Sequence, residues 1–347
     1  DRIDYSNDTA TASPKGSFTV ARSMLAATGN SSFGYFGGGN NPAISPSRLS
    51  SVDRVDYLND TTTAVAKGPL TAGKYSVVAT GNNDFGYFGG GTPGPDGMST
   101  VDRIDYSNDS ATASPKGQMT VGRFDFGGTG NQDFGYFGAG RNDYGGPYYT
   151  TVDRIDYSND TANASPKGPL SFSPGRYGIR ATGNASFGYF GGGKEPSIYS
   201  SVDRIDYSSD TATSLQKGPL TAGKYNTAAT GNADFGYFAG GFIPSLTPGP
   251  KSSVDRIDYS NDTATASPKG PLSDGRPRLG ASSARANGFV PIGPALTDNT
   301  AAVAGSFNPT QFGYFGGSGN PSTDASTIHR IEYANDTVTT SRRAILT

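Results

Sequence analysis

Residues 203–213 read DRIDYSSDTAT, and this phrase decides the fold because the chain repeats it. Close copies begin at Asp1, Asp53, Asp102, Asp153 and Asp255, and a divergent copy, HRIEYANDTVT, spans 329–339. Successive copies start 52, 49, 51, 50, 52 and 74 residues apart. A period near 50 residues is typical of β-propellers, in which each repeat forms one blade. We therefore interpret the phrase as architecture and not as a catalytic motif.

A second phrase, FGYFGG or a close variant, lies between successive copies of the first. It begins at Phe33, Phe85, Phe134, Phe187, Phe235 and Phe312, mostly after ATGN or GTGN. Gly and Asn tolerate the positive φ that a tight hairpin demands. In the second repeat we expect strands at 74–80, 85–90, 99–106 and 110–114, and then a PKGPL-type crossing to the next unit. Four antiparallel strands in one such repeat make a propeller blade.

Composition excludes several classes of function. The net charge is −2, so no general attraction to nucleic acid is expected. There is no cysteine, which excludes disulfides and thiolate metal sites. No apolar run is long enough to span a membrane, so no membrane insertion is expected. The chain starts at Asp1, inside a phrase, and we expect an upstream part to be missing.

The order YFGGG, VDRIDYSNDT, PKGPLTAGKY resembles the kelch repeat. In that resemblance the glycine pair is Gly89–Gly90, the tyrosine is Tyr106, and the basic residue after the crossover is Arg123. The equivalent basic positions are Arg22, Lys74, Arg176, Lys224 and Arg276. Kelch blades usually carry an outer tryptophan, whereas this chain has none and places small residues such as Ala113 there. The phrases also resemble repeat arrays in structural proteins of marine tailed phages, especially cyanophages.

We expect an all-β, kelch-like propeller of four-stranded antiparallel blades, built as one domain over 1–347. Seven DRIDY-type strands, with RLGASSA, RANG and FVPIG as a degenerate hairpin within 271–311, favour seven blades. The alternative is six blades, with five complete ones over 17–270, a blade shared by the termini, and 300–347 as an extra unit or tail. The repeat units are expected at 17–68, 69–117, 118–168, 169–218, 219–270 and 271–347, with a half-blade at 1–16.

The charged residues of the phrase have a structural interpretation and a metal-binding one. In a strand, Arg54 and Asp56 share a face, which suits a repeated ion pair or a bridge to the neighbouring blade. Asp4, Ser6 and Asp8 alternate like the start of a calcium loop but lack its later Gly and distal Glu. We favour ion pairs and turn capping, and we read the NDT and NDS sequons as turns. No metal site and no cofactor is predicted.

Catalysis is not predicted, and no catalytic residue is assigned. The single histidine, His329, replaces the first Asp of the phrase, so neither a His-dependent triad nor a zinc site can be built around it. A carboxylate-pair glycosidase stays formally possible, but no acid pair stands apart from the repeat.

Function is expected in the loops that escape the repeat. These loops lie between the second and third strands, differ in every unit and should project from one rim, so either they bind a partner or they vary because nothing constrains them. The candidate binding residues are Arg141, Asp143, Tyr144, Tyr148, Tyr149, Tyr199 and Phe242.

We predict a structural or recognition protein of a virion or extracellular surface. Its partners would be a host glycan or neighbouring proteins of the same assembly. The alternative is an intracellular kelch-type adaptor that binds a protein. The sequence leaves the oligomeric state open.

Overall fold

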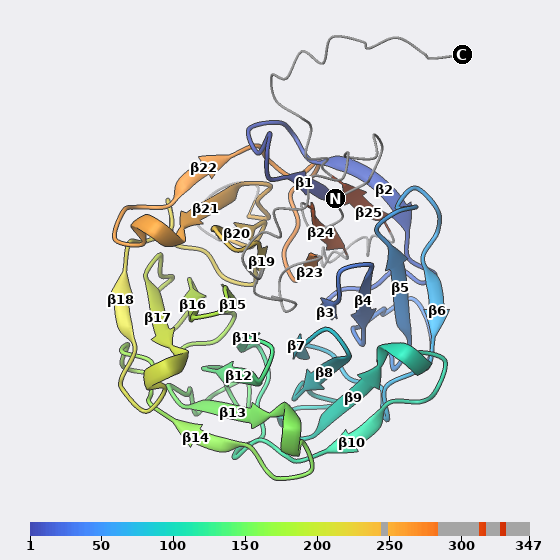
Figure 1. The fold of residues 1–347 in the computed structure, drawn as a ribbon, viewed down its shortest axis with the longest axis horizontal. Coiled ribbons are helices and arrows are strands. Elements are labelled where there is room, and N and C mark those ends of the chain that lie inside the picture. Colours follow the sequence, from blue (N-terminus) through green and yellow to red (C-terminus); the bar gives the residue numbers. More distant parts are fainter. Residues whose placement is uncertain (244–248, 284–311, 317–326, 331–347) are drawn as a thin grey trace, which may run out of the picture.

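A computed structural model describes residues 1–243, 249–283, 312–316 and 327–330, the last two ranges as backbone. Six sheets stand in a ring, and in each blade the first strand lies innermost and the fourth outermost (Figure 1). Residues of the first strands line a central channel. Five of these sheets are four-stranded antiparallel blades, and the sixth combines both ends of the chain.

The blades follow each other along the chain. Blade 1 contains β3 (Ala26–Gly29), β4 (Phe33–Gly37), β5 (Val52–Asp56) and β6 (Val65–Lys67); blade 2 contains β7 (Val78–Gly81), β8 (Phe85–Gly89), β9 (Val101–Asp105) and β10 (Ser114–Lys116). Blade 3 contains β11 (Gly127–Gly130), β12 (Phe134–Gly138), β13 (Val152–Asp156) and β14 (Ser165–Lys167); blade 4 contains β15 (Arg180–Gly183), β16 (Phe187–Gly191), β17 (Val202–Asp206) and β18 (Leu215–Lys217). Blade 5 contains β19 (Ala228–Gly231), β20 (Phe235–Ala239), β21 (Val254–Asp258) and β22 (Ser267–Lys269).

The terminal sheet contains β1 (Arg2–Asp4), β2 (Ser13–Ser17), β23 (Gly280–Ser283), β24 (Phe312–Gly316) and β25 (Thr327–Arg330). Its β23 pairs with β24, so the FGYF phrase at 312 completes the RLGASSA hairpin. The segment FVPIG, expected to do so, lies outside the described residues.

The expected number of blades is therefore wrong. The described residues form five four-stranded blades, where we favoured seven and allowed six. The remaining sheet has five strands, because it receives a DRIDY-type strand from each end of the chain. The expectation that 300–347 lies apart from the ring also fails, since β24 and β25 belong to that sheet.

Two strand boundaries differ from the expected ones for local reasons. After β9 the chain forms a 3-10 turn at Tyr106–Asn108, and the fourth strand begins only at Ser114. Pro115 is tolerated inside β10 because an outermost strand has one unpaired side. The first strand begins at Val78, because Ser76 has a φ of 53°, which is incompatible with extended backbone.

The DRIDY phrase forms the third strand, and its apolar residues pack between blades, as predicted. Ile155 and Tyr157 of blade 3 share one buried cluster with Val78 and Tyr87 of blade 2. The rings of Tyr87 and Tyr157 stack with their centroids 4.7 Å apart. Because FGYF tyrosines stack in this way on phrase tyrosines of the next sheet, aromatic rings fill the contact between blades without tryptophan.

A buried carboxylate joins each sheet to the one before it. Asp109, in the turn after β9, accepts hydrogen bonds from Arg54 at 2.7 Å and from the Tyr35 hydroxyl at 2.8 Å. The ammonium of Lys67 lies 3.0 Å from its other oxygen. The same set of bonds recurs around the ring at Asp160, Asp210, Asp262 and Asp8, and arginine and lysine meet the sixth carboxylate at Asp60.

These junctions support the structural interpretation of the phrase. The predicted bridge to a neighbouring blade is confirmed for Arg54, since Asp109 belongs to blade 2. The predicted turn capping is confirmed at Asp56, whose carboxylate accepts from the Leu58 backbone N–H at 2.9 Å.

The basic residues that carry the kelch resemblance are buried inside each blade. The ammonium of Lys74 lies 3.1 Å from Asp102, the first aspartate of the phrase in the same blade. Arg123 forms the equivalent ion pair with Asp153 and also donates to the carbonyl of Thr151 at 3.0 Å. A buried cation with several partners is strongly destabilised when one partner is removed, so these positions are structural.

We predict that Ile155→Asp lowers the free energy of unfolding by several kcal/mol. The side chain is 2% exposed, and the substitution buries a charge without a partner. A thermal melt measures the loss. Leu58→Asp, at a side chain that is 63% exposed, is the control and should melt like the parent. An unchanged melt for Ile155→Asp would contradict the packing described here.

Acid should weaken the junctions between sheets. Burial opposes ionisation of Asp109, but hydrogen bonds from Lys67 and Tyr35 outweigh it and lower the pKa of this carboxyl below its ordinary 3.8. The pKa values of Asp160 and Asp262 are lowered in the same way. A carboxyl with a lowered pKa in the folded state stabilises that state above its unfolded pKa.

That stabilisation is lost as the pH falls through the folded pKa. We therefore expect a melting temperature that is nearly constant above about pH 5 and falls steeply below about pH 4. Asp109→Asn should lower the plateau and reduce the acid-dependent drop. A melting temperature equal at pH 3 and pH 7 would show that the junction carboxylates contribute no stability.

Candidate functional site: an aromatic arc on the loop face

Each variable loop begins beside the residue that follows a buried lysine or arginine. Tyr75, Phe124, Tyr177 and Tyr225 each come directly after a basic residue and form isolated bridges with Thr92, Arg141, Lys194 and Phe242, respectively, at the start of the loops. This pairing places the loops and the four rings on one face, around the entrance to the channel. Blade 1 and the terminal sheet have Ser23 and Pro277 in the same position, so the rings belong to blades 2 to 5 only.

The loop of blade 3 adds two further rings. Tyr144 meets Phe124 edge-on, with ring centroids 5.3 Å apart, and its hydroxyl lies 2.8 Å from that of Tyr75. Tyr148 stacks on Tyr177 at 5.7 Å. We call the set the aromatic arc; its members are Tyr75, Phe124, Tyr144, Tyr148, Tyr177, Tyr225 and Phe242.

Arg141 holds the centre of the arc. Its guanidinium carbon lies 3.9 Å from the ring centroid of Tyr177 and 4.9 Å from that of Tyr144. The guanidinium also pairs with Asp125 at 2.7 Å. Cation–π contact combined with an ion pair fixes the side chain, so the rings around it are held before any ligand arrives.

The far end of the arc carries a second cation. Tyr225 meets Tyr177 edge-on at 6.1 Å and Phe242 at 5.8 Å. The ammonium of Lys194 lies 5.7 Å from the ring centroid of Tyr225. Electrostatic interaction with Tyr177 is the main cause that raises the pKa of Lys194, so this group stays charged at neutral pH.

The candidate residues predicted from sequence divide into two groups. Arg141, Tyr144, Tyr148 and Phe242 come together in the arc, and Tyr144 is 52% exposed. Asp143 lies beside them, but its carboxylate accepts from the Tyr144 backbone N–H and so shapes the loop.

Tyr149 and Tyr199 are not part of the arc. Each occupies the position at the end of the loop that the buried Leu49 occupies in blade 1. The backbone N–H groups of all three residues donate to the carbonyl of a glycine at the start of the loop. Tyr149 covers the guanidinium of Arg123 at 5.7 Å, and Tyr199 covers that of Arg176 at 3.8 Å. Both rings therefore have a packing role, and their assignment as binding residues stays a prediction.

Sequence reasoning missed Tyr75, Phe124, Tyr177 and Tyr225 because they belong to the regular repeat. A signal was present in the sequence: the position after the basic residue is aromatic in four units and Ser or Pro in the other two. Because the fold does not require an aromatic residue at this position in every repeat, the aromatic side chains there are candidates for binding.

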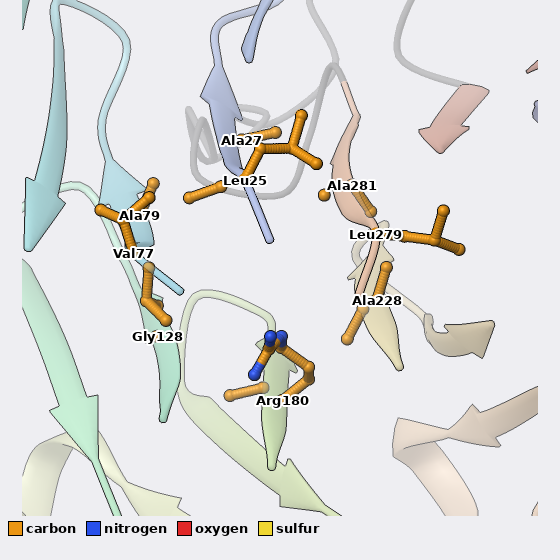
Figure 2. A pocket seen from close by; sticks show the side chains of 14 residues that line it. Leu25, Ala27, Val77, Ala79, Gly128, Arg180, Ala228, Leu279 and Ala281 are labelled. Carbon is orange, nitrogen blue, oxygen red and sulfur yellow. The ribbon is translucent and has the colours of Figure 1, made fainter. Parts of the chain in front are cut away.

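The channel beside the arc is narrow. Six residues with positive φ form a closed ring of backbone hydrogen bonds at the channel entrance. The N–H of each donates to the carbonyl of the equivalent residue one sheet earlier; they are Met24, Ser76, Asp125, Gly178, Asn226 and Arg278. Below them the lining is mostly Ala, Gly, Val and Leu, and Arg180 extends its guanidinium between the strands (Figure 2). The cavity is about 40 Å³, room for roughly three water molecules, so a sugar ring cannot enter it.

Metal chemistry finds no support in the described part of the chain. Within it, no three His, Cys, Asp or Glu side chains come together as a metal site would require. In the same residues, no helix is long and apolar enough to cross a membrane. His329 lies in β25, and its side chain is outside the description.

Comparison with known proteins establishes the fold. No family model and no curated protein matches the sequence. A solved structure titled "Structure of YjhT" is similar with a TM-score of 0.66 and 12% identity, over 91% of this chain and 95% of that one. At this identity the similarity supports a β-propeller of four-stranded blades and carries no function.

We predict that chelators leave the stability unchanged, because the acids of the phrase serve junctions and turns. The measurement is a thermal melt with and without EDTA, after extensive dialysis in both cases. A fall of several degrees in the presence of EDTA, reversed by calcium, would show that the repeated acids bind metal.

Proposed function

We propose that the protein is a non-enzymatic recognition module that binds a carbohydrate through the aromatic arc. The observation that carries this proposal is the arrangement of Tyr144, Tyr148 and Tyr177 around Arg141, which offers flat apolar rings beside fixed hydrogen-bond donors. A sugar ring has the complementary surface, with C–H groups on its faces and hydroxyls at its edge. Tyrosine provides both kinds of contact from one side chain.

The size of the arc favours a sugar over a protein. A standard protein interface covers about 800 Å² on each partner and centres on buried apolar anchors. On this face, among the described residues, Tyr144 and Ile44 are the large apolar side chains with high exposure. Of the remaining rings, Phe124 is buried, and the others, Tyr75, Tyr148, Tyr177, Tyr225 and Phe242, are half-buried. So little exposed apolar surface suits a small polar ligand.

The setting of the module is part of the proposal. The phrases resemble those of marine tailed-phage structural proteins, so we place the propeller on a virion or in an extracellular assembly, where it would contact a host glycan. The kelch resemblance and the adaptor function it implies are the alternative, in which the same face would bind a protein.

Replacing Tyr144 and Tyr177 by Ala should abolish most glycan binding and leave folding intact. We expect affinity to fall by ~1–2 kcal/mol, the scale of a hot-spot truncation, or about five- to thirtyfold. The measurement is a glycan array followed by titration of the best sugar. A melting curve of each variant establishes that the propeller is folded.

Two controls make the result specific. Leu58→Ala and Leu215→Ala remove exposed side chains of the outer strand regions and should bind like the parent. Tyr149→Ala should lower the melting temperature without selective loss of binding, because this ring covers buried Arg123. Undiminished sugar binding by the double variant would contradict the proposal. So would a parent protein that binds no sugar but binds another protein through the arc.

A further inference from the structure

The fourth strands of the blades differ in how their outer edges are protected. A fourth strand has no neighbour on its outer side, and a proline there has no N–H to offer to another chain. The fourth strands of blades 2, 3 and 5 have a proline in the middle, at Pro115, Pro166 and Pro268. In blades 1 and 4 the same position holds Ala66 and Gln216. Two of the five blades therefore lack this protection.

The prolines also indicate where the N–H groups of Ala66 and Gln216 point. Pro115 lies opposite Asp102 of β9, and the two strands pair although proline cannot donate a hydrogen bond. Ala66 and Gln216 have the same register against β5 and β17. The N–H at this position is therefore not needed inside the blade and points outward, and both side chains are exposed.

The residue before this position changes in the same two blades. It is serine in the three strands that contain proline, and Val65 or Leu215 in β6 and β18. The side chain of Val65 is 53% exposed and that of Leu215 is 59% exposed. An exposed aliphatic side chain on an edge that can form hydrogen bonds is a combination that favours pairing with another strand. Both features occur together in blades 1 and 4.

Lysine, which often protects an edge, is occupied in both strands. The ammonium of Lys67 lies 3.0 Å from Asp109, and that of Lys217 lies 3.1 Å from Asp262. Each lysine thus belongs to the junction with the next sheet. The charge is held there, so it does not prevent a second strand from approaching the edge.

The two open edges lie on opposite sides of the ring, where β6 and β18 face in opposite directions (Figure 1). Each consists of three residues, VAK in β6 and LQK in β18. A molecule with two such edges can bind one partner on each side. A second copy of the same chain offers strands of matching length and pattern, and repeated pairing of copies would continue in a line.

We propose that β6 and β18 are self-association sites, at which each strand pairs antiparallel with an open edge of a second copy of this chain. With the middle residues opposite each other, the aliphatic residue of one strand faces the lysine of the other. No two lysines are then opposed, and the aliphatic part of each lysine packs on Val65 or Leu215. The site uses neither the variable loops nor the aromatic arc, so it is independent of sugar binding.

The association is weak. Two strands of three residues bury less than the roughly 1,200 Å² of a stable complex, and such small interfaces are typical of transient contacts. Pairing therefore becomes substantial at high protein concentration, or where many copies are held close together in one assembly.

Sedimentation of the parent and of proline variants tests the proposal. Between about 10 μM and about 1 mM we expect the average mass of the parent to rise above that of the monomer. Ala66→Pro combined with Gln216→Pro should remain monomeric and melt like the parent, because blades 2, 3 and 5 already have proline at this position. Ala66→Ser with Gln216→Ser keeps both N–H groups and should associate like the parent.

The single proline variants identify which edges meet. If β6 pairs with β18 of the next copy, Ala66→Pro alone leaves only monomers. If each edge pairs with its own equivalent, the same variant stops at dimers formed through β18. A parent that stays monomeric up to about 1 mM, or a double proline variant that associates like the parent, would overturn the proposal.

Cross-linking tests the same contact without proline, in case the proline variants fold poorly. The chain has no cysteine, and residues opposite each other on antiparallel strands have Cα atoms about 4.5–5.5 Å apart, within the range of a disulfide. Ala66→Cys with Gln216→Cys should form intermolecular disulfides and a ladder of oligomers on oxidation. Ser165→Cys with Ser267→Cys, on the outer strands that keep their proline, is the matched control. Equal cross-linking of the two double variants would show random collision and would contradict pairing at the open edges.

Discussion

The ring depends on one buried carboxylate per sheet. This aspartate ends the NDT or NDS turn of the phrase, yet it serves the preceding sheet, where a tyrosine, an arginine and a lysine converge on it. Removing one member leaves buried charges without partners, which costs more than the pair itself contributes. Because Asp8 and Asp60 continue the pattern across the two ends of the chain, the same chemistry that joins neighbouring blades also closes the circle.

Much of this architecture could be predicted from the letters. The period near 50 residues and the alternation of FGYF with DRIDY predict the hairpins, the third strand and its interblade packing. Spacing could not predict which aspartate receives Arg54, because the partner lies 55 residues away in the next blade. The fourth strand was misplaced because the PKG segment was assigned to the crossing into the next unit, whereas an outermost strand tolerates its proline.

The prediction of the number of blades failed for a different reason. Counting third strands assumes that each one finds its own partner, and here two copies at opposite ends of the chain meet a single FGYF strand. The candidate site was half predictable for a related reason. Tyr144 and Tyr149 lie in the same loop, but Tyr149 stands where the repeat needs a cover for its buried arginine. The composition of the loop does not distinguish Tyr144 from Tyr149, whereas an alignment of the repeats does.

The identical junctions have a consequence for how such a protein can change. Every blade presents the same acceptor to its predecessor and the same donors to its successor, so nothing in these junctions specifies which blade comes next. Covalent order alone sets the sequence of loops around the rim. Recombination between near-identical repeats of a gene could therefore exchange whole blades, and with them whole loops, while keeping the carboxylate junctions between sheets. The six-membered ring of backbone hydrogen bonds at the channel entrance limits this freedom, because it fixes the circumference: units can be shuffled within the circle, but adding or losing one would break it.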